Sequence, residues 1–149
     1  QKITLAAAGV VADGIESFLK SMEITLPAIT VKWPNDLLAN GRKLCGILSE
    51  SILHDKEITS LAIGCGLNVN MVASELPEEI REEAVSLKDL TGKDLIREEI
   101  LAHILNQFEQ AYEKWERSNY AHVVEEWKKR CKHIGQALTI VTPDRKFTA

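Results

Sequence analysis

The sequence lacks the features that mark membrane-spanning and nucleic-acid-binding proteins. No apolar run approaches the roughly 20 residues that span a bilayer, and no basic-then-apolar signal peptide pattern is present. The formal net charge of −4 provides no general attraction to nucleic acid or to an anionic membrane. The 149 residues, of which 45% are apolar and 27% charged, therefore predict one soluble domain with a hydrophobic core.

Cysteine and histidine are too few and too scattered to indicate a metal site. The three cysteines, Cys45, Cys65 and Cys131, form no CxxC pair, and the four histidines form no HxH or HxxxH pair. We therefore expect no metal bound by these residue types, and buried, reduced thiols in a cytoplasmic protein. No serine lies in a GxSxG pattern, so a serine hydrolase has no support.

Apolar residues at spacings of three and four predict helices over residues 3–22, 94–117 and 120–131. Gly9 and Gly14 in the first helix indicate close packing against a neighbour. We expect Asp94 to cap the second helix. The apolar stripe of the second helix should pack in the core, through Ile96, Ile100, Leu101, Ile104, Leu105, Phe108, Ala111, Tyr112 and Trp115.

Three runs rich in β-branched and apolar residues predict strands over 28–33, from 43 to about 51 or 53, and over 57–69. In order along the chain they form an antiparallel meander, joined at its second turn by His54, Asp55 and Lys56. The centre of the third strand, residues 61–67, is almost wholly apolar or glycine, so we expect it to be buried on both faces.

The remaining segments are less regular. Residues 71–83 form an acidic loop, and Ser86 and Gly92 mark the start and end of a short helix. Residues 137–141 predict a last strand that opens another small unit, so we expect domains over 1–136 and 137–149.

The chemistry is concentrated in residues 31–51. Pro34 interrupts the first strand, and Asn40-Gly41 predicts a two-residue hairpin in which Leu38 faces Lys43 and Leu37 faces Leu44. Lys32 and Lys43 then lie on either side of the turn, where two ammonium groups can hold an anionic ligand. Taken singly, each lysine is more simply a solvated surface residue, and Asp36 a surface ion-pair partner.

The segment from Gly64 to Asn68 has two glycines but lacks the third glycine and the following helix of a dinucleotide fingerprint. The missing side chains of Gly64 and Gly66 instead let a ligand approach the strand. Asn68 either offers its amide to a polar ligand group or forms a turn.

Three motifs together resemble the catalytic domain of the biotin protein ligases. Residues 32–36 read Lys-Trp-Pro-Asn-Asp like the family's KWPND motif, and residues 43–50 resemble its K-[LI]-x-G-I-L-x-E strand. Residues 63–70 are similar to its IGxGxNVN segment. The three motifs occur in order within about 40 residues, so the resemblance is specific, and it extends over nearly the whole chain.

The resemblance implies an α+β fold like that of class II aminoacyl-tRNA synthetases and biotin synthetase. It implies that biotin and Mg-ATP form biotinoyl-5′-AMP and pyrophosphate, after which the biotinoyl group passes to a lysine of a biotin carboxyl carrier domain. Lys43 matches the lysine between the biotin carboxyl and the phosphate, and Asp36 either helps to hold Mg²⁺ or accepts from the incoming lysine. The biotin pocket is implied for Lys43, Gly46, Ile47, Leu48, Gly64 and Gly66. The nucleotide side is implied for Lys32, Trp33, Asn35 and Asn68.

The chain departs from the family pattern in one respect, because the glycine- and arginine-rich GRGRxxR loop is absent. We therefore expect a fragment without the first part of the domain, with a truncated small β-barrel at its end and with little or no activity when isolated. Lipoate or octanoate transfer is the alternative within the superfamily. A non-catalytic binding or dimerisation module is a third alternative, and a homodimer is left open.

Overall fold

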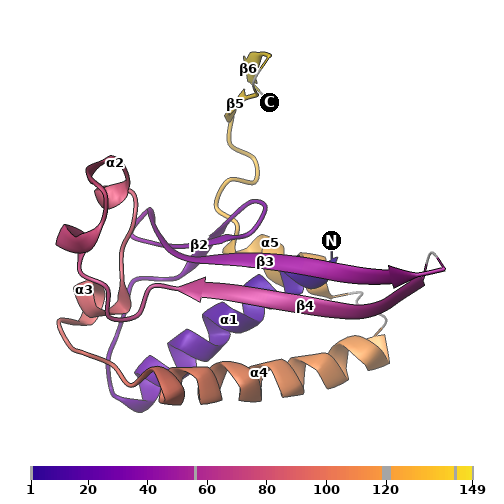
Figure 1. Cartoon of the computed structure of the whole chain (residues 1–149), viewed down its shortest axis with the longest axis horizontal. Coiled ribbons are helices and arrows are strands. Elements are labelled where there is room, and N and C mark those ends of the chain that lie inside the picture. The colour runs from indigo at the N-terminus through magenta and orange to yellow at the C-terminus, as the bar shows by residue number, and fades with distance from the viewer. Residues whose placement is uncertain (1, 56, 119–121, 143, 149) are drawn as a thin grey trace.

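The computed structural model describes residues 2–55, 57–118, 122–142 and 144–148. Four antiparallel strands form one sheet in the order β1-β2-β3-β4, and helices pack against it (Figure 1). The α+β class with an antiparallel sheet is thereby confirmed. The strands of this sheet are β1 (Thr30–Lys32), β2 (Asp36–Ala39), β3 (Arg42–His54) and β4 (Glu57–Leu67). The helices are α1 (Lys2–Ser21), η1 (Ala73–Glu75), α2 (Glu78–Arg81), α3 (Leu87–Thr91), α4 (Arg97–Ser118) and α5 (Val123–Arg130).

Helix α1 forms the centre of the core, where it contacts α4, α5 and the sheet. It approaches α4 closely at Gly14, where an added Cβ would lie 2.7 Å from the Cα of Ile104. A Cβ on Gly9 would meet nothing within 4 Å. The predicted close packing is therefore confirmed at Gly14 and not at Gly9.

Arg130, the last residue of α5, fastens this helix to α1. Its guanidinium donates to both carboxylate oxygens of Glu16, at 2.9 and 2.7 Å, and also pairs with Asp13. It donates further to the carbonyl of Ile29, just before the sheet begins, at 3.1 Å. The hydrogen bond that Arg130 donates to Glu16 is the largest cause of the raised pKa of Arg130. Arg130 thus links α5 to α1 and to the residue that precedes β1.

The sheet has one more strand than the sequence predicted, because the chain reverses at residues 33–35. Lys32 pairs with Asp36 across this reversal, so residues 36–39 form a strand of their own. The hairpin at Asn40-Gly41 has the predicted pairing of Leu38 with Lys43, and both turn residues have positive φ. The predicted pairing of Leu37 with Leu44 is wrong: Leu37 pairs with Cys45, since a β-bulge inserts Leu44 into β3.

The prediction that residues 61–67 are buried on both faces is also wrong. Among the described residues β4 pairs only with β3, so β4 is an edge strand, and most of it is exposed. Ile63 and Leu67 are half-buried on the face that packs toward the core. A continuous apolar run indicates double burial only in a central strand with layers on both sides.

The predicted core stripe of α4 is only partly buried, since α4 contacts α1 along one side. Ile100 and Ile104 are buried and Phe108 is half-buried. Four members of the stripe are instead exposed, namely Ile96, Leu101, Leu105 and Tyr112.

The predicted cap at Asp94 is wrong as well, because α4 begins at Arg97. Asn70 exchanges two hydrogen bonds with the backbone of Leu95, at 2.8 and 2.9 Å, and Asp94 pairs with Lys88. The short helix α3 does have Ser86 as its N-cap and Gly92, at φ 71°, as its C-cap, as predicted. The acidic segment 71–83 contains η1 and α2 in place of a plain loop.

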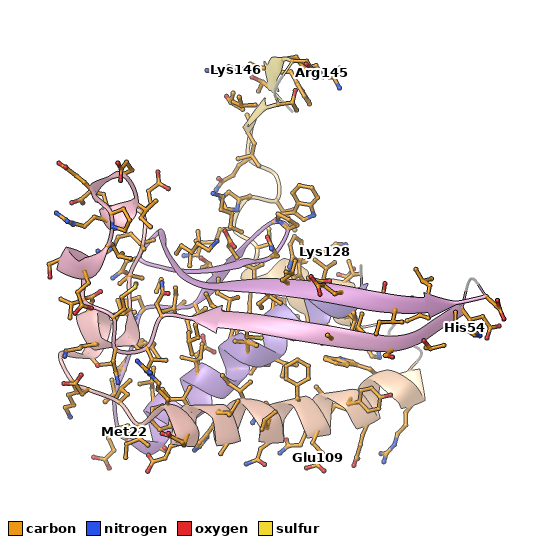
Figure 2. The ribbon with its side chains drawn as sticks, viewed as in Figure 1. Met22, His54, Glu109, Lys128, Arg145 and Lys146 are labelled. Carbon is orange, nitrogen blue, oxygen red and sulfur yellow. The ribbon has the colours of Figure 1, made fainter. Side chains whose placement is uncertain are left out.

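After α5 the chain leaves the main body and forms a two-stranded hairpin, β5 (Thr139–Val141) and β6 (Lys146–Thr148). Figure 2 shows Arg145 and Lys146 in this hairpin, far from His54 at the tip of the β3–β4 hairpin. The predicted strand at 137–141 is confirmed in its second half, whereas the division into two domains stays a prediction. The predicted helix start at Tyr120 and the turn residue Lys56 lie outside the described residues.

Within the described ranges, no helix combines the length and apolar character that crossing a membrane requires.

Candidate active site

An ion pair between β2 and β3 lies at the centre of the candidate site. The Nζ of Lys43 lies 2.8 Å from Oδ1 of Asp36, and the two side chains are 50% and 21% exposed. A pair with this exposure contributes only about 0–1 kcal/mol to stability. An anionic ligand can therefore compete with Asp36 for the ammonium group at little cost to the fold.

The bulge in β3 explains why these two side chains meet. Leu44 and Cys45 are consecutive residues, yet both are fully buried, which regular alternation forbids. Lys43 and Gly46 therefore both emerge on the face away from the core. A Cβ on Gly46 would lie 3.4 Å from Lys43 Nζ and 3.6 Å from Asp36 Oδ1. A methyl group at this position would thus already contact the ion pair, which lies directly above Gly46.

The same face continues across the sheet as a flat floor with few side chains. Gly46 pairs with Gly66, and Leu48 pairs with Gly64. A Cβ on Gly64 or Gly66 would meet no atom closer than a backbone oxygen at 3.8 or 3.7 Å, so the space above both is open. A planar or bicyclic group can lie against this floor with one end at Lys43. Ile47 faces the opposite way and is buried in the core.

A cavity of about 700 Å³ opens beside the ion pair and contains four of the predicted residues. Lys32, Asp36, Lys43 and Asn68 all line it. The opposite wall comes from the segment between β4 and α3, with Met71, Leu76, Ile80, Glu82, Glu83 and Ala84. The motif pattern did not indicate this wall, since its residues are an ordinary acidic surface stretch in the sequence.

The backbone of Lys43 forms hydrogen bonds with three other residues. Its N–H donates to the carbonyl of Glu83 at 2.7 Å, and its carbonyl accepts from the N–H of Val85 at 2.9 Å. The side-chain nitrogen of Asn68 donates to the same carbonyl at 3.3 Å and to that of Val85 at 3.1 Å. Segment 83–85 and Asn68 therefore fix the point from which the ammonium group projects.

Asn35 and Trp33 occupy different surroundings from the four cavity residues. The side-chain nitrogen of Asn35 donates to the carbonyl of Ile47 at 2.8 Å, and the Ile47 N–H donates back to the Asn35 carbonyl at 2.9 Å. Trp33 is 69% exposed and does not line the cavity. The structure therefore brings Lys32, Asp36, Lys43 and Asn68 together at one cavity, whereas Asn35 lies in the turn before β2 and is hydrogen-bonded to Ile47 of β3.

Cys45 lies beneath the site, but its thiol is unreactive. Burial, and then the neighbouring Cys65 and Asp36, raise its pKa to about 12, although Lys43 acts in the opposite direction. Because the thiolate is the reactive form, Cys45 cannot serve as a nucleophile near neutral pH. The chemistry of the site therefore depends on its charges and shape.

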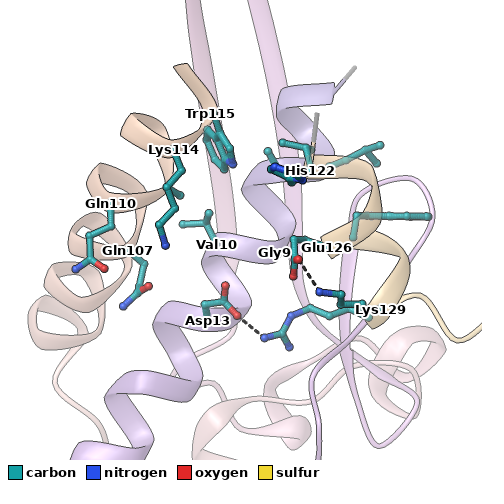
Figure 3. Close-up of a pocket in the computed structure, with 16 residues that line it drawn as sticks. Gly9, Val10, Asp13, Gln107, Gln110, Lys114, Trp115, His122, Glu126 and Lys129 are labelled. Carbon is teal, nitrogen blue, oxygen red and sulfur yellow. Dashed lines mark hydrogen bonds and ion pairs between the residues drawn. The ribbon is translucent and has the colours of Figure 1, made fainter. Parts of the chain in front are cut away.

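A second cavity of about 670 Å³ lies between α1, α4 and α5 (Figure 3). Figure 3 shows Lys114 of α4 extending toward α1, and the ion pair of Glu126 with Lys129 at its rim. Asp13 in its wall is paired with Arg130. The charges are mixed and several are satisfied within the wall, so this cavity shows no preference for one class of ligand.

No group of three or more His, Cys, Asp or Glu side chains in the described part of the chain is arranged to hold a metal ion. The cavity does present Asp36, and Glu82 and Glu83 in the opposite wall. Mg²⁺ characteristically takes one or two protein carboxylates and completes its shell with phosphate and water. The donor set is thus compatible with a magnesium–nucleotide complex as a substrate.

Comparison with known proteins agrees with the motifs. The sequence model of the biotin/lipoate A/B protein ligase family matches residues 3–68, from α1 to Asn68. The bifunctional ligase/repressor BirA of Bacillus subtilis is 34% identical over 146 residues, which are 98% of this chain and 43% of that protein. The biotin–[acetyl-CoA-carboxylase] ligase of Mycobacterium tuberculosis is 32% identical over 142 residues, 95% of this chain and 48% of that protein.

Among solved structures, the biotin protein ligase of Aquifex aeolicus in complex with biotin and ATP resembles this fold with a TM-score of 0.78. It is 25% identical in sequence, and the likeness covers 99% of this chain and 58% of that one. The fold and the matched motifs define a protein of the biotin and lipoate ligase class. Within that class, this chain belongs to the biotin protein ligase family. It spans less than half the length of these curated relatives.

Proposed function

We propose that the protein containing this chain activates biotin with ATP and attaches it to a lysine of a biotin carboxyl carrier domain. In the first step a biotin carboxylate oxygen bonds to the α-phosphorus, and the bond from that phosphorus to pyrophosphate breaks. In the second step the carrier amine bonds to the biotinoyl carbonyl carbon, AMP leaves, and the amine loses a proton. The observation that carries the proposal is the ammonium of Lys43 at the end of a glycine floor.

The first step joins two anions, so a fixed cation between them lowers the barrier. Lys43 projects over Gly46, where a carboxylate at the end of a ring on the floor would meet the nucleotide phosphate. A charge-assisted hydrogen bond contributes about 1.5–3 kcal/mol, which corresponds to roughly 10- to 100-fold in rate. Lys32, in the wall of the same cavity, supplies a second positive charge on the nucleotide side.

The ring would lie on Gly46, Gly64 and Gly66, with Leu48 as an apolar edge and Ile47 as support from the core. The nucleotide would occupy the neighbouring cavity, which Lys32 and Asn68 line. Asn35 and the exposed Trp33 complete the motif at its margin.

Asp36 is the carboxylate closest to Lys43 and has two candidate roles. In the first role it would help to hold Mg²⁺ with the nucleotide phosphates, whose charge the ion would partly neutralise. Alternatively, once an anionic ligand has taken the ammonium of Lys43, the Asp36 carboxylate is free to accept a hydrogen bond from the incoming lysine amine.

The chain would supply part of the catalytic domain in residues 1–136 and the first hairpin of a small β-barrel in residues 137–149. The BirA relative of Bacillus subtilis is more than twice as long, and this sequence contains no GRGRxxR loop to close over the adenylate. We therefore expect the isolated chain to have little or no ligase activity. Experiments on activity accordingly require the full-length protein that contains it.

The matched family also includes lipoate ligases, so lipoate is the second candidate substrate. The glycine floor at Gly46, Gly64 and Gly66 favours a fused bicyclic ring, because a flat, wide group gains contact there that a narrow chain does not. Calorimetric titration of the full-length protein with biotin and with lipoate separates the two. Tight binding of biotin alone is expected, and tight binding of lipoate without biotin would refute the assignment.

A further inference from the structure

Two asparagines hold the part of β3 that carries the candidate site. Asn68, from the end of β4, donates both side-chain N–H groups to carbonyls, at 3.3 Å to Lys43 and at 3.1 Å to Val85. Its backbone N–H donates to the carbonyl of Leu44 at 2.9 Å. It therefore grips the chain at the residue before the bulge and at the inserted residue itself.

Asn35 holds the other end of the same segment. Its side chain and its backbone carbonyl exchange two hydrogen bonds with Ile47, at 2.8 and 2.9 Å. The five residues from Lys43 to Ile47 are thus fastened at both ends, and the bulge between the fastenings places Lys43 against Asp36 above Gly46. A bulge disrupts regular ladder pairing, so its geometry depends on such additional bonds.

From this geometry we propose that Asn68 and Asn35 are positioning residues, which act on the reaction by setting the place of the Lys43 ammonium. The inference rests on the proposed adenylation of biotin. Both amide hydrogens of Asn68 are engaged within the protein, so it has only its side-chain oxygen for a ligand. Direct donation from Asn68 to a phosphate or a base would require breaking a bond to Lys43 or to Val85.

A double-mutant cycle in the full-length protein tests whether Asn68 acts through Lys43. We expect Asn68→Ala to lower kcat for biotinoyl-adenylate formation by about tenfold with a smaller change in KM, since about two hydrogen bonds are lost. In the Lys43→Ala background the same substitution should change kcat by less than about twofold. An equal loss in both backgrounds, or no loss in the wild type, overturns the proposal.

Asn70→Ala is the matched control. Asn70 lies two residues away, and its side chain also forms two hydrogen bonds with backbone: it donates to the carbonyl of Leu95 and accepts from the N–H of Leu95, away from the site. Asn70→Ala should lower the thermal midpoint about as much as Asn68→Ala does, because it also removes two hydrogen bonds. It should leave kcat within about twofold of wild type, because neither bond involves β3. An equal fall in kcat for Asn70→Ala would mean that general loosening explains the effect. If Asn68→Ala does not fold, Asn35→Ala in the same cycle applies the same criterion from the other end.

Hydrogen exchange separates this inference from the proposed function. The amide of Val85 donates to the Lys43 carbonyl, so Asn68→Ala should speed its exchange by about tenfold while Asn70→Ala does not. Unchanged exchange at Val85 shows that Asn68 does not hold the segment. Failure of the wild-type protein to form any biotinoyl-adenylate instead refutes the proposed function, and the exchange result then still decides whether the asparagines hold β3.

Discussion

The two glycines of α1 provide a matched test of how closely it packs against α4. At Gly14 an alanine Cβ would lie 2.7 Å from the Cα, 2.8 Å from the Cγ1 and 3.1 Å from the backbone nitrogen of Ile104. Ordinary carbon contacts are about 3.5–4.0 Å, so the helices must separate by roughly 1 Å. Two of these neighbours are backbone atoms, which cannot move without moving α4. At Gly9 the same methyl would meet nothing within 4 Å.

The magnitudes follow from these distances. Replacing glycine by alanine within a helix stabilises it by about 1 kcal/mol, and overpacking a core costs about 1–3 kcal/mol. Because backbone atoms block the methyl, we expect the high end of that cost at Gly14. Gly14→Ala should then lower the free energy of unfolding by about 2 kcal/mol, whereas Gly9→Ala should raise it by up to about 1 kcal/mol.

Thermal unfolding followed by circular dichroism measures both variants. At about 2–4 °C per kcal/mol, the midpoint should fall by roughly 4–8 °C for Gly14→Ala and rise by about 2–4 °C for Gly9→Ala. Equal midpoints for the two variants would refute the close contact between α1 and α4.

Three further predictions concern the site and its support. Gly46→Val should weaken biotin binding to the full-length protein by at least about tenfold in calorimetry, because the γ-methyl groups extend beyond a Cβ that already contacts the ion pair. Gly46→Ala should weaken binding by less, because its Cβ lies at ordinary contact distances of 3.4 Å from Lys43 Nζ and 3.6 Å from Asp36 Oδ1. Arg130→Ala should lower the free energy of unfolding, measured by chemical denaturation, by about 1–3 kcal/mol, because it removes the ion-pair partner of two carboxylates on α1. Lys129→Ala, which breaks an exposed ion pair, should leave the free energy of unfolding unchanged. Alkylation at pH 8, read by mass spectrometry, should modify Cys65 and spare Cys45, whose pKa of about 12 keeps it protonated; modification of Cys45 in the folded protein would contradict its burial.

The sequence predicted those features of the fold that depend only on a few neighbouring residues. Ser86 caps the start of α3 and Gly92 caps its end, as predicted, because capping and positive φ depend on a few neighbouring residues. The hairpin pairing of Leu38 with Lys43 follows from Asn40-Gly41 for the same reason. These features need no knowledge of distant packing.

The errors arose where tertiary context decides. The burial of β4 depends on which other elements cover the sheet, and the residues of β4 alone do not indicate which elements these are. The bulge at Leu44 comes from bonds to Asn68 and to residues 83–85, which are distant in sequence. Asp94 resembled a helix cap, but Asn70 forms two hydrogen bonds with the backbone of the next residue, Leu95, and α4 begins only at Arg97.

The candidate site shows the same division. The motifs identified four residues that do line one cavity, including Lys43 and Asp36. They could not show that the cavity is completed by residues 71–84, or that Asn35 and Asn68 use their side chains to grip β3. Only a structure shows which hydrogen bonds within the protein already occupy a polar side chain.

The most direct test of the account is the rate at which the full-length protein forms biotinoyl-5′-AMP from biotin and radiolabelled ATP, compared between wild type and Lys43→Ala. Lys128→Ala, which removes a lysine from an exposed pair on α5, is the control. We predict that Lys43→Ala slows adenylate formation by roughly 10- to 100-fold with a thermal midpoint within a few degrees of wild type, and that Lys128→Ala does neither. An unchanged rate in Lys43→Ala, or adenylation of lipoate and not of biotin by the wild type, would contradict it.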